Sequence, residues 1–241
     1  MAGPREPGDS AATVSTAAPP VRTRFIHIAL LLLSFSAGAA DAFAFLALGG
    51  IFTANMTGNL ILTGMFTRAE FGTTLWTAVV AILVFTGVLY AAFRLTATGV
   101  GGPASPRRVM RRLILPSIVV QTVVVLIWLP FHGQGLLERG VVIALACTAL
   151  ALQTVGARKL SDVDGITTTY VTGTLTTTMQ DLAERRQTGQ PLRILSVLAL
   201  PIGAVCGTAA LAFATWSGPL VPWISATIAT VLLALSRRRS A

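Results

Sequence analysis

Apolar residues gather into six long stretches, separated by shorter segments that carry most of the charged residues. Each stretch is close to the roughly 20 residues that a helix needs to cross a bilayer. The pattern therefore predicts an all-α integral membrane protein with six transmembrane helices. The predicted helices are Phe25–Leu48, Leu75–Phe93, Leu113–Leu129, Gly140–Val155, Ile194–Thr215 and Leu220–Leu235.

Two polar segments interrupt this pattern. The first follows a carboxylate, Asp41, and a glycine pair, Gly49-Gly50, and covers Phe52–Phe66. The second, Ile166–Leu182, is rich in threonine and lies between the fourth and fifth helices. A bilayer tolerates irregular backbone only where protein buries it or a cavity solvates it. We therefore predict interrupted or re-entrant segments after helices one and four.

A short repeat suggests how the six helices are organised. Thr57-Gly58-Asn59-Leu60 recurs as Thr172-Gly173-Thr174-Leu175, 115 positions later. The same offset carries the start of helix one onto the start of helix four. Three helices in each half require the second half to enter the membrane from the opposite side, which predicts an inverted repeat. The predicted halves are residues 25–131 and 140–235, within one membrane domain, 23–236.

Composition supports the membrane assignment, and it indicates that the net positive charge reflects orientation in the membrane. The chain is 54% hydrophobic and 11% charged, with a mean hydropathy of +0.75, whereas soluble domains carry about 25% charged residues. The formal net charge of +9 comes from basic residues grouped in alternate loops and at both ends. Such clusters are typical of cytoplasmic loops, so we predict a cell-membrane protein with both termini in the cytoplasm. Nucleic-acid binding is not indicated.

The two ends of the chain have a different composition. Residues 1–22 are rich in alanine, proline, serine and threonine without apolar periodicity, and we predict a disordered cytoplasmic tail. Residues 237–241 form a short basic tail.

The interrupted segment also resembles a known family. Asp41-Ala42-Phe43, the run Phe52–Leu60 (FTANMTGNL) and Gly64 are similar to the signature of the YoaK-like bacterial membrane proteins. The resemblance covers about Phe25 to Leu235. It implies a small inner-membrane protein of about six helices, in a domain family of unknown function. The second-half motif is looser, because Tyr170 and Thr174 stand where Asn55 and Asn59 would align.

Asp41 is the sharpest candidate site residue, and two interpretations remain open for it. It could form a proton or cation site or contact a polar substrate, because intramembrane carboxylates usually face a functional interior. Alternatively, it could cap or pair locally near the outer end of helix one.

The other candidates are amide and hydroxyl side chains in the two polar segments: Asn55, Thr57, Asn59, Thr172 and Thr174. Asn55 and Asn59 share a helical face at the i, i+4 spacing. These residues could line a shared polar pathway, or they could hold helices together by hydrogen bonds. We predict that they form a substrate-binding pocket with Asp41 at its edge.

The function classes follow from these residues. A transporter or permease for a small polar solute is predicted from the inverted repeat, the interrupted helices and the polar residues in them. The alternative is a membrane interaction or accessory protein that transports nothing. We expect no enzyme, because the sequence has no nucleophile–base pair, and we expect no metal or cofactor. Small-residue stripes, such as Gly203 with Gly207, allow close packing within the chain or between copies in a homo-oligomer.

The predicted orientation can be tested with reporter fusions. Because the basic clusters alternate between loops, fusions after Gly102 and Ser236 should report the cytoplasm, and a fusion near Gly133 should report the outside. An outside signal from the Ser236 fusion would overturn the six-helix orientation.

Overall fold

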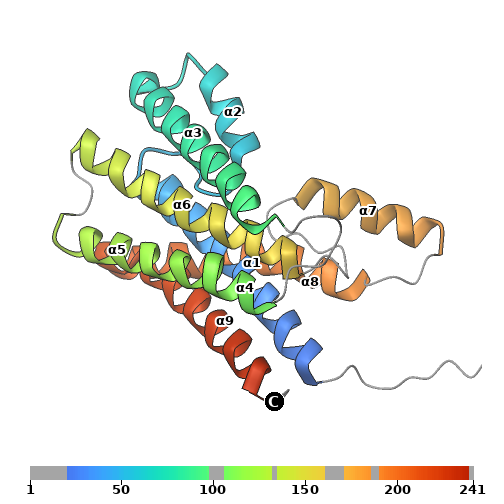
Figure 1. Ribbon diagram of the computed structural model, residues 1–241. Helices are drawn as coiled ribbons and strands as arrows, with labels where there is room; N and C mark the ends of the chain where they lie inside the picture. The colour runs from blue at the N-terminus through green and yellow to red at the C-terminus, as the bar shows by residue number, and fades with distance from the viewer. Residues whose placement is uncertain (1–20, 98–105, 132–134, 161–170, 186–189, 239–241) are drawn as a thin grey trace, which may run out of the picture.

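The described part of the chain consists of helices joined by turns and short irregular segments, with no strand in the described ranges. The computed structural model describes residues 21–97, 106–131, 135–160, 171–185 and 190–238. Three predicted features therefore lie wholly or partly outside the description, at residues 1–20, 166–170 and 239–241. The elements are α1 (Val21–Ala47), α2 (Met56–Gly64), α3 (Phe71–Thr96), α4 (Pro106–Val109), a π-helical turn (Met110–Ile114), α5 (Leu115–Phe131), α6 (Leu136–Leu160), α7 (Val171–Ala183), α8 (Gln190–Phe213), a 3₁₀ turn (Thr215–Ser217) and α9 (Leu220–Arg238) (Figure 1).

Six helices in the described ranges are long and apolar enough to cross a membrane, which confirms the predicted number. Their bounds differ from the prediction mainly at polar ends. The helix predicted over Gly140–Val155 runs from Leu136 to Leu160, because charged residues such as Glu138 and Lys159 continue its first and last turns. Apolar length predicts the part of a helix that lies in hydrocarbon, and the polar turns beyond it carry no such signal.

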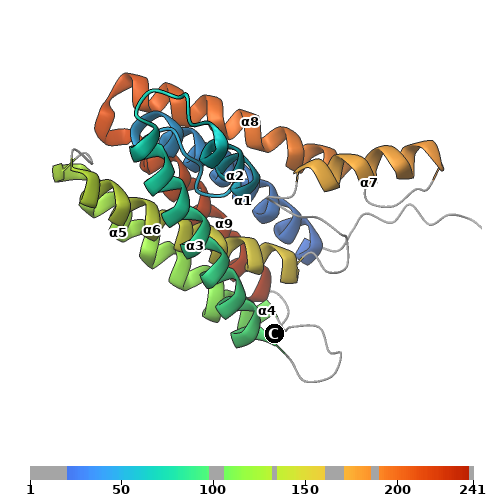
Figure 2. The ribbon, with the colours of Figure 1, turned by 90° about the horizontal axis from the view of Figure 1, so that it is seen from above.

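Helices α1 and α6 lie at the centre of the bundle. Within the most apolar 18-residue stretch of each helix, the buried share is 67% in α1 and 61% in α6. The corresponding share in α8 is 17%. Helix α1 packs against α8 and α9, and α6 packs against α3 and α5 (Figures 1 and 2). The two short helices are peripheral, since α2 packs on α3 and α7 packs on α8.

Glycines bring α1 and α8 unusually close together. A Cβ atom on Gly203 would overlap the carbonyl oxygen of Phe35, and one on Gly38 would overlap that of Leu200. Gly207 lies one turn after Gly203 and faces Ala39, one turn after Phe35, so the two helices run parallel. The small-residue stripes predicted from the sequence therefore serve packing within the chain.

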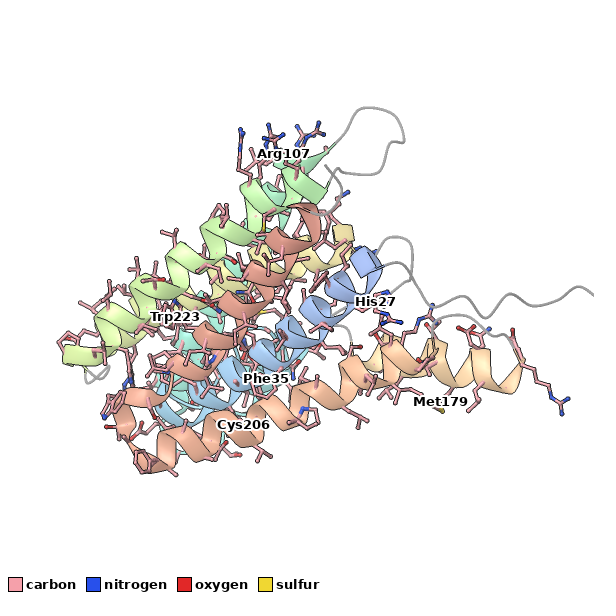
Figure 3. The ribbon with its side chains drawn as sticks, turned by 90° about the horizontal axis from the view of Figure 1, so that it is seen from below. His27, Phe35, Arg107, Met179, Cys206 and Trp223 are labelled. Atoms are coloured by element: carbon pink, nitrogen blue, oxygen red, sulfur yellow. The ribbon has the colours of Figure 1, made fainter. Side chains whose placement is uncertain are left out.

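Helix α7 begins beside the bundle and runs out past it (Figures 1 and 2). An ion pair fastens it to the start of α8, with Arg193 Nη1 2.7 Å from Asp181 Oδ2. Both side chains are about nine-tenths buried. Met179 lies on the exposed side of the same helix (Figure 3).

The glycine contact gives a direct test of α1–α8 packing. Gly203→Ala should lower thermal stability measurably, because overpacking of this kind typically costs about 1–3 kcal/mol and the obstacle is backbone rather than a mobile side chain. The measurement is the melting temperature of the purified protein in detergent. Gly87→Ala is the matched control, because Gly87 also lies in a membrane helix and a Cβ there meets nothing within 4 Å. Equal melting temperatures for both variants would contradict the described packing.

Candidate functional site

Two consecutive glycines turn the chain at the end of α1. Gly49 and Gly50 have φ values of 101° and 74°, a region that other residues rarely adopt. Space is also limited, because a Cβ on Gly50 would overlap Nη2 of Arg68. The glycine pair therefore ends α1 and reverses the chain direction, as the sequence pattern predicts.

The carboxylate of Asp41 fastens the returning chain. Its Oδ1 accepts hydrogen bonds from the backbone N–H of Thr53 at 2.7 Å, the hydroxyl of Thr53 at 3.0 Å and the backbone N–H of Ala54 at 2.7 Å. Asp41 lies six residues before Ala47, which is about 9 Å along the helix axis. The chain after α1 therefore runs back alongside α1 before α2 begins.

Two asparagines complete this segment in different ways. The buried Asn59 side chain accepts from the N–H of Phe52 at 2.8 Å and donates to its carbonyl oxygen at 2.7 Å. It therefore satisfies both backbone groups of a residue outside regular structure. Asn55 is the N-cap of α2 and accepts from the N–H of Gly58 at 3.1 Å.

A cavity of about 870 Å³ opens between this segment and α8. Helix α1 contributes one wall, including Asp41 and Phe45, and the returning chain with the first turns of α2 contributes a second. Helix α8 supplies Leu200, Ala204 and Thr208, and the start of α7 supplies Thr172. The volume lies within the range of roughly 300–1,000 Å³ that is typical of small-molecule sites.

Four of the six predicted site residues line this one cavity: Asp41, Asn55, Thr57 and Thr172. The other two do not line it. Asn59 is fully buried between α2 and the returning chain, and Thr174 is buried with 5% of its surface exposed.

Sequence reasoning missed the aromatic part of the wall. The rings of Phe45 and Phe52 stack with centroids 5.1 Å apart. The guanidinium of Arg68 lies 5.7 Å from the centroid of Phe45 and donates to the carbonyl oxygen of Gly50 at 3.4 Å. Phe45 is one helical turn after Asp41, so its position on the same face of α1 was available from the sequence. The position of Thr208 in the cavity wall could not be predicted from the sequence, because it depends on how α8 packs on α1.

These features define a class: an all-helical, multi-pass membrane protein with a side-chain-lined cavity among its helices. The chain belongs to the family described as "Protein of unknown function (DUF1275)", whose model matches residues 29–235. It is similar to the UPF0700 transmembrane protein YoaK of Bacillus subtilis (strain 168), with 31% identity over 161 residues, 65% of this chain and 67% of the relative. No solved structure matches. The predicted resemblance to the YoaK-like family is thus confirmed.

The role of Asp41 in holding the returning chain can be measured. Asp41→Ala removes three hydrogen bonds to a carboxylate, each typically worth about 1.5–3 kcal/mol. We expect it to raise the rate at which a thiol reagent labels Ala54→Cys by about tenfold or more, since tenfold corresponds to about 1.4 kcal/mol. The background should be Cys147→Ala with Cys206→Ala, to remove the native thiols of the described chain.

Glu138→Ala is the control for this experiment, because Glu138 accepts from the backbone N–H of Gly135, just before α6, and does not line the cavity. It should leave the labelling rate unchanged. A slow rate in Asp41→Ala, equal to that of the parent, would mean that other contacts hold Thr53 and Ala54 in place.

Proposed function

We propose that this protein is a small-solute transporter or permease and that its binding site is the cavity beside Asp41. One observation carries the proposal: a cavity of ligand size reaches a carboxylate within a membrane-spanning helix. Polar side chains from distant parts of the chain line it, with Asn55 and Thr57 on one side and Thr172 and Thr208 on the other. A dry, fully packed centre would instead favour the accessory-protein alternative.

We also propose that the two halves form an inverted repeat. Helices α6 and α7 begin 115 positions after α1 and α2, and α8 and α9 begin close to the same offset from α3 and α4. The packing is consistent with this, because α1 contacts α8 and α9 in the way that α6 contacts α3 and α5. Inverted repeats with interrupted helices are common in secondary transporters.

The inferred membrane placement makes α2 a re-entrant element. Since α2 starts beside Asp41, about 9 Å before the end of α1, its first turn would lie at membrane depth. We place both termini in the cytoplasm. This puts the basic end of the bundle, where Arg107 and its neighbours extend (Figure 3), on the cytoplasmic side, as the charge rule favours.

We propose binding and passage of a solute rather than catalysis. The side chains that line the cavity supply one carboxylate, one amide and hydroxyls, but no His, Cys or Lys among the described residues. That set suits hydrogen bonding to a solute better than it suits nucleophilic chemistry.

Transport can be tested before the solute is identified. Proteoliposomes would be incubated with a defined mixture of amines, amino acids, sugars and organic acids, and the lumen analysed by mass spectrometry. We expect at least one solute to accumulate above the level in empty liposomes. Thr57→Leu, which replaces an exposed cavity hydroxyl by a larger apolar side chain, should reduce that accumulation at least about tenfold, as expected where a polar contact to the solute is lost.

Thr63→Leu is the matched control, because Thr63 lies on the same helix, its hydroxyl bonds the carbonyl oxygen of Leu60, and it does not line the cavity. It should retain uptake. Equal uptake by Thr57→Leu and the parent, or no solute above empty liposomes, would favour the accessory-protein function.

A further inference from the structure

The cavity has an unbalanced charge. Among the described residues that line it, Asp41 is the one that carries a charge. Its side chain is almost fully buried, since only 9% of the residue remains accessible, and it has no ion-pair partner in the described part of the chain. Buried intramembrane charges are normally paired, so a cation that enters the cavity would supply the countercharge that the described chain does not.

The hydrogen bonds to Asp41 do not remove this imbalance. The donors from Thr53 and Ala54 are neutral groups, so they stabilise the carboxylate without neutralising it. All three bonds end on Oδ1, and the backbone N–H of Asn55 also lies close to the carboxylate. Each of these donors is uncharged, and Asp41 still lines the cavity. Arg68 does not line the cavity and is held over the ring of Phe45 and against the carbonyl oxygen of Gly50.

The rest of the wall indicates what kind of cation fits. Much of the lining is apolar or aromatic, from Phe45, Phe52, Ile61 and Leu200. Aromatic faces attract cations, and Phe45 already does so with Arg68. Divalent metal ions are usually bound through several charged or imidazole side chains, and no group of three or more His, Cys, Asp or Glu side chains converges in the described ranges.

We propose that the cavity selects small organic cations, namely amines with an apolar or aromatic body. The ammonium group donates to the Asp41 carboxylate, and the body lies against Phe45 and Phe52. The amide of Asn55 and the hydroxyls of Thr57 and Thr172 offer further acceptors for ammonium protons. This assignment rests on the proposed function, because it names the substrate class of the same site.

The test compares three probes that share one skeleton and differ in charge: phenethylamine, 2-phenylethanol and 3-phenylpropionate. Binding to the full chain in lipid nanodiscs would be measured by equilibrium dialysis at about pH 7.5, with empty nanodiscs subtracted. Phenethylamine should bind at least about tenfold more tightly than the alcohol, as a charge-assisted hydrogen bond provides. The carboxylate should bind more weakly than the alcohol.

Two variants assign the preference to Asp41. Asp41→Asn keeps an acceptor for Thr53 and Ala54 but removes the charge, so it should weaken phenethylamine binding about tenfold. Its affinity for 2-phenylethanol should stay within about twofold, which also reports that the cavity is intact. Glu70→Gln removes an exposed carboxylate outside the cavity lining and should leave all three affinities unchanged.

The contrary outcomes are distinct. Equal binding of amine and alcohol by the parent chain, a preference for the carboxylate, or amine binding that survives Asp41→Asn would each overturn the assignment. Asp41-dependent binding of ²²Na⁺ without amine binding would overturn it in favour of an inorganic cation. Amine binding without flux in proteoliposomes would support the selection of amines and reject the transport function. Flux of neutral solutes without amine binding would support the transport function and reject the selection of amines.

Discussion

The three hydrogen bonds that end on Asp41 Oδ1 are the interaction on which the site depends. Once Gly49 and Gly50 break α1, the chain presents backbone N–H groups among apolar helices. Each such group costs several kcal/mol if it has no partner in hydrocarbon. Asp41 accepts two of them and the Thr53 hydroxyl, and Asn59 serves Phe52. These contacts fix where α2 begins and therefore where the cavity has its second wall.

The third wall follows from a different constraint, the closeness of two backbones. Gly38, Gly203 and Gly207 let α1 and α8 touch along one line of contact. Beyond that line two of the three lining residues of α8, Ala204 and Thr208, are small, and the third is Leu200. Larger side chains at those two positions would reduce the volume of the cavity. Small residues therefore have two effects on this side of α8: the glycines allow close packing against α1, and Ala204 and Thr208 leave space for the cavity.

The sequence predicted what depends on local rules. Six spans follow from apolar length, and the break follows from the glycine pair, because both signals lie within one segment. The prediction that Asn55 and Asn59 share a helical face is wrong for a local reason. Asn55 is the N-cap of α2 and does not have helical backbone angles, so the i, i+4 relation does not apply to it. The place of Thr208 and the burial of Thr174 required tertiary packing, which a periodic pattern does not encode.

The same packing limits how the cavity can change shape. Its α8 wall belongs to the least covered of the membrane helices in the described ranges, so the outer side of α8 has little protein to hold it. Its restraints lie on the inner side, at the glycine contacts with α1, and at its start, where Arg193 pairs with Asp181 of α7. Helix α7 also packs on α8 and carries Thr172 into the cavity. Protein covers the Asp41 wall more completely, since α1 is the most covered membrane helix in the described ranges and holds the returning chain by its carboxylate. The cavity thus combines a well-covered wall, which carries the charge, with an α8 wall that protein covers mainly on its inner side.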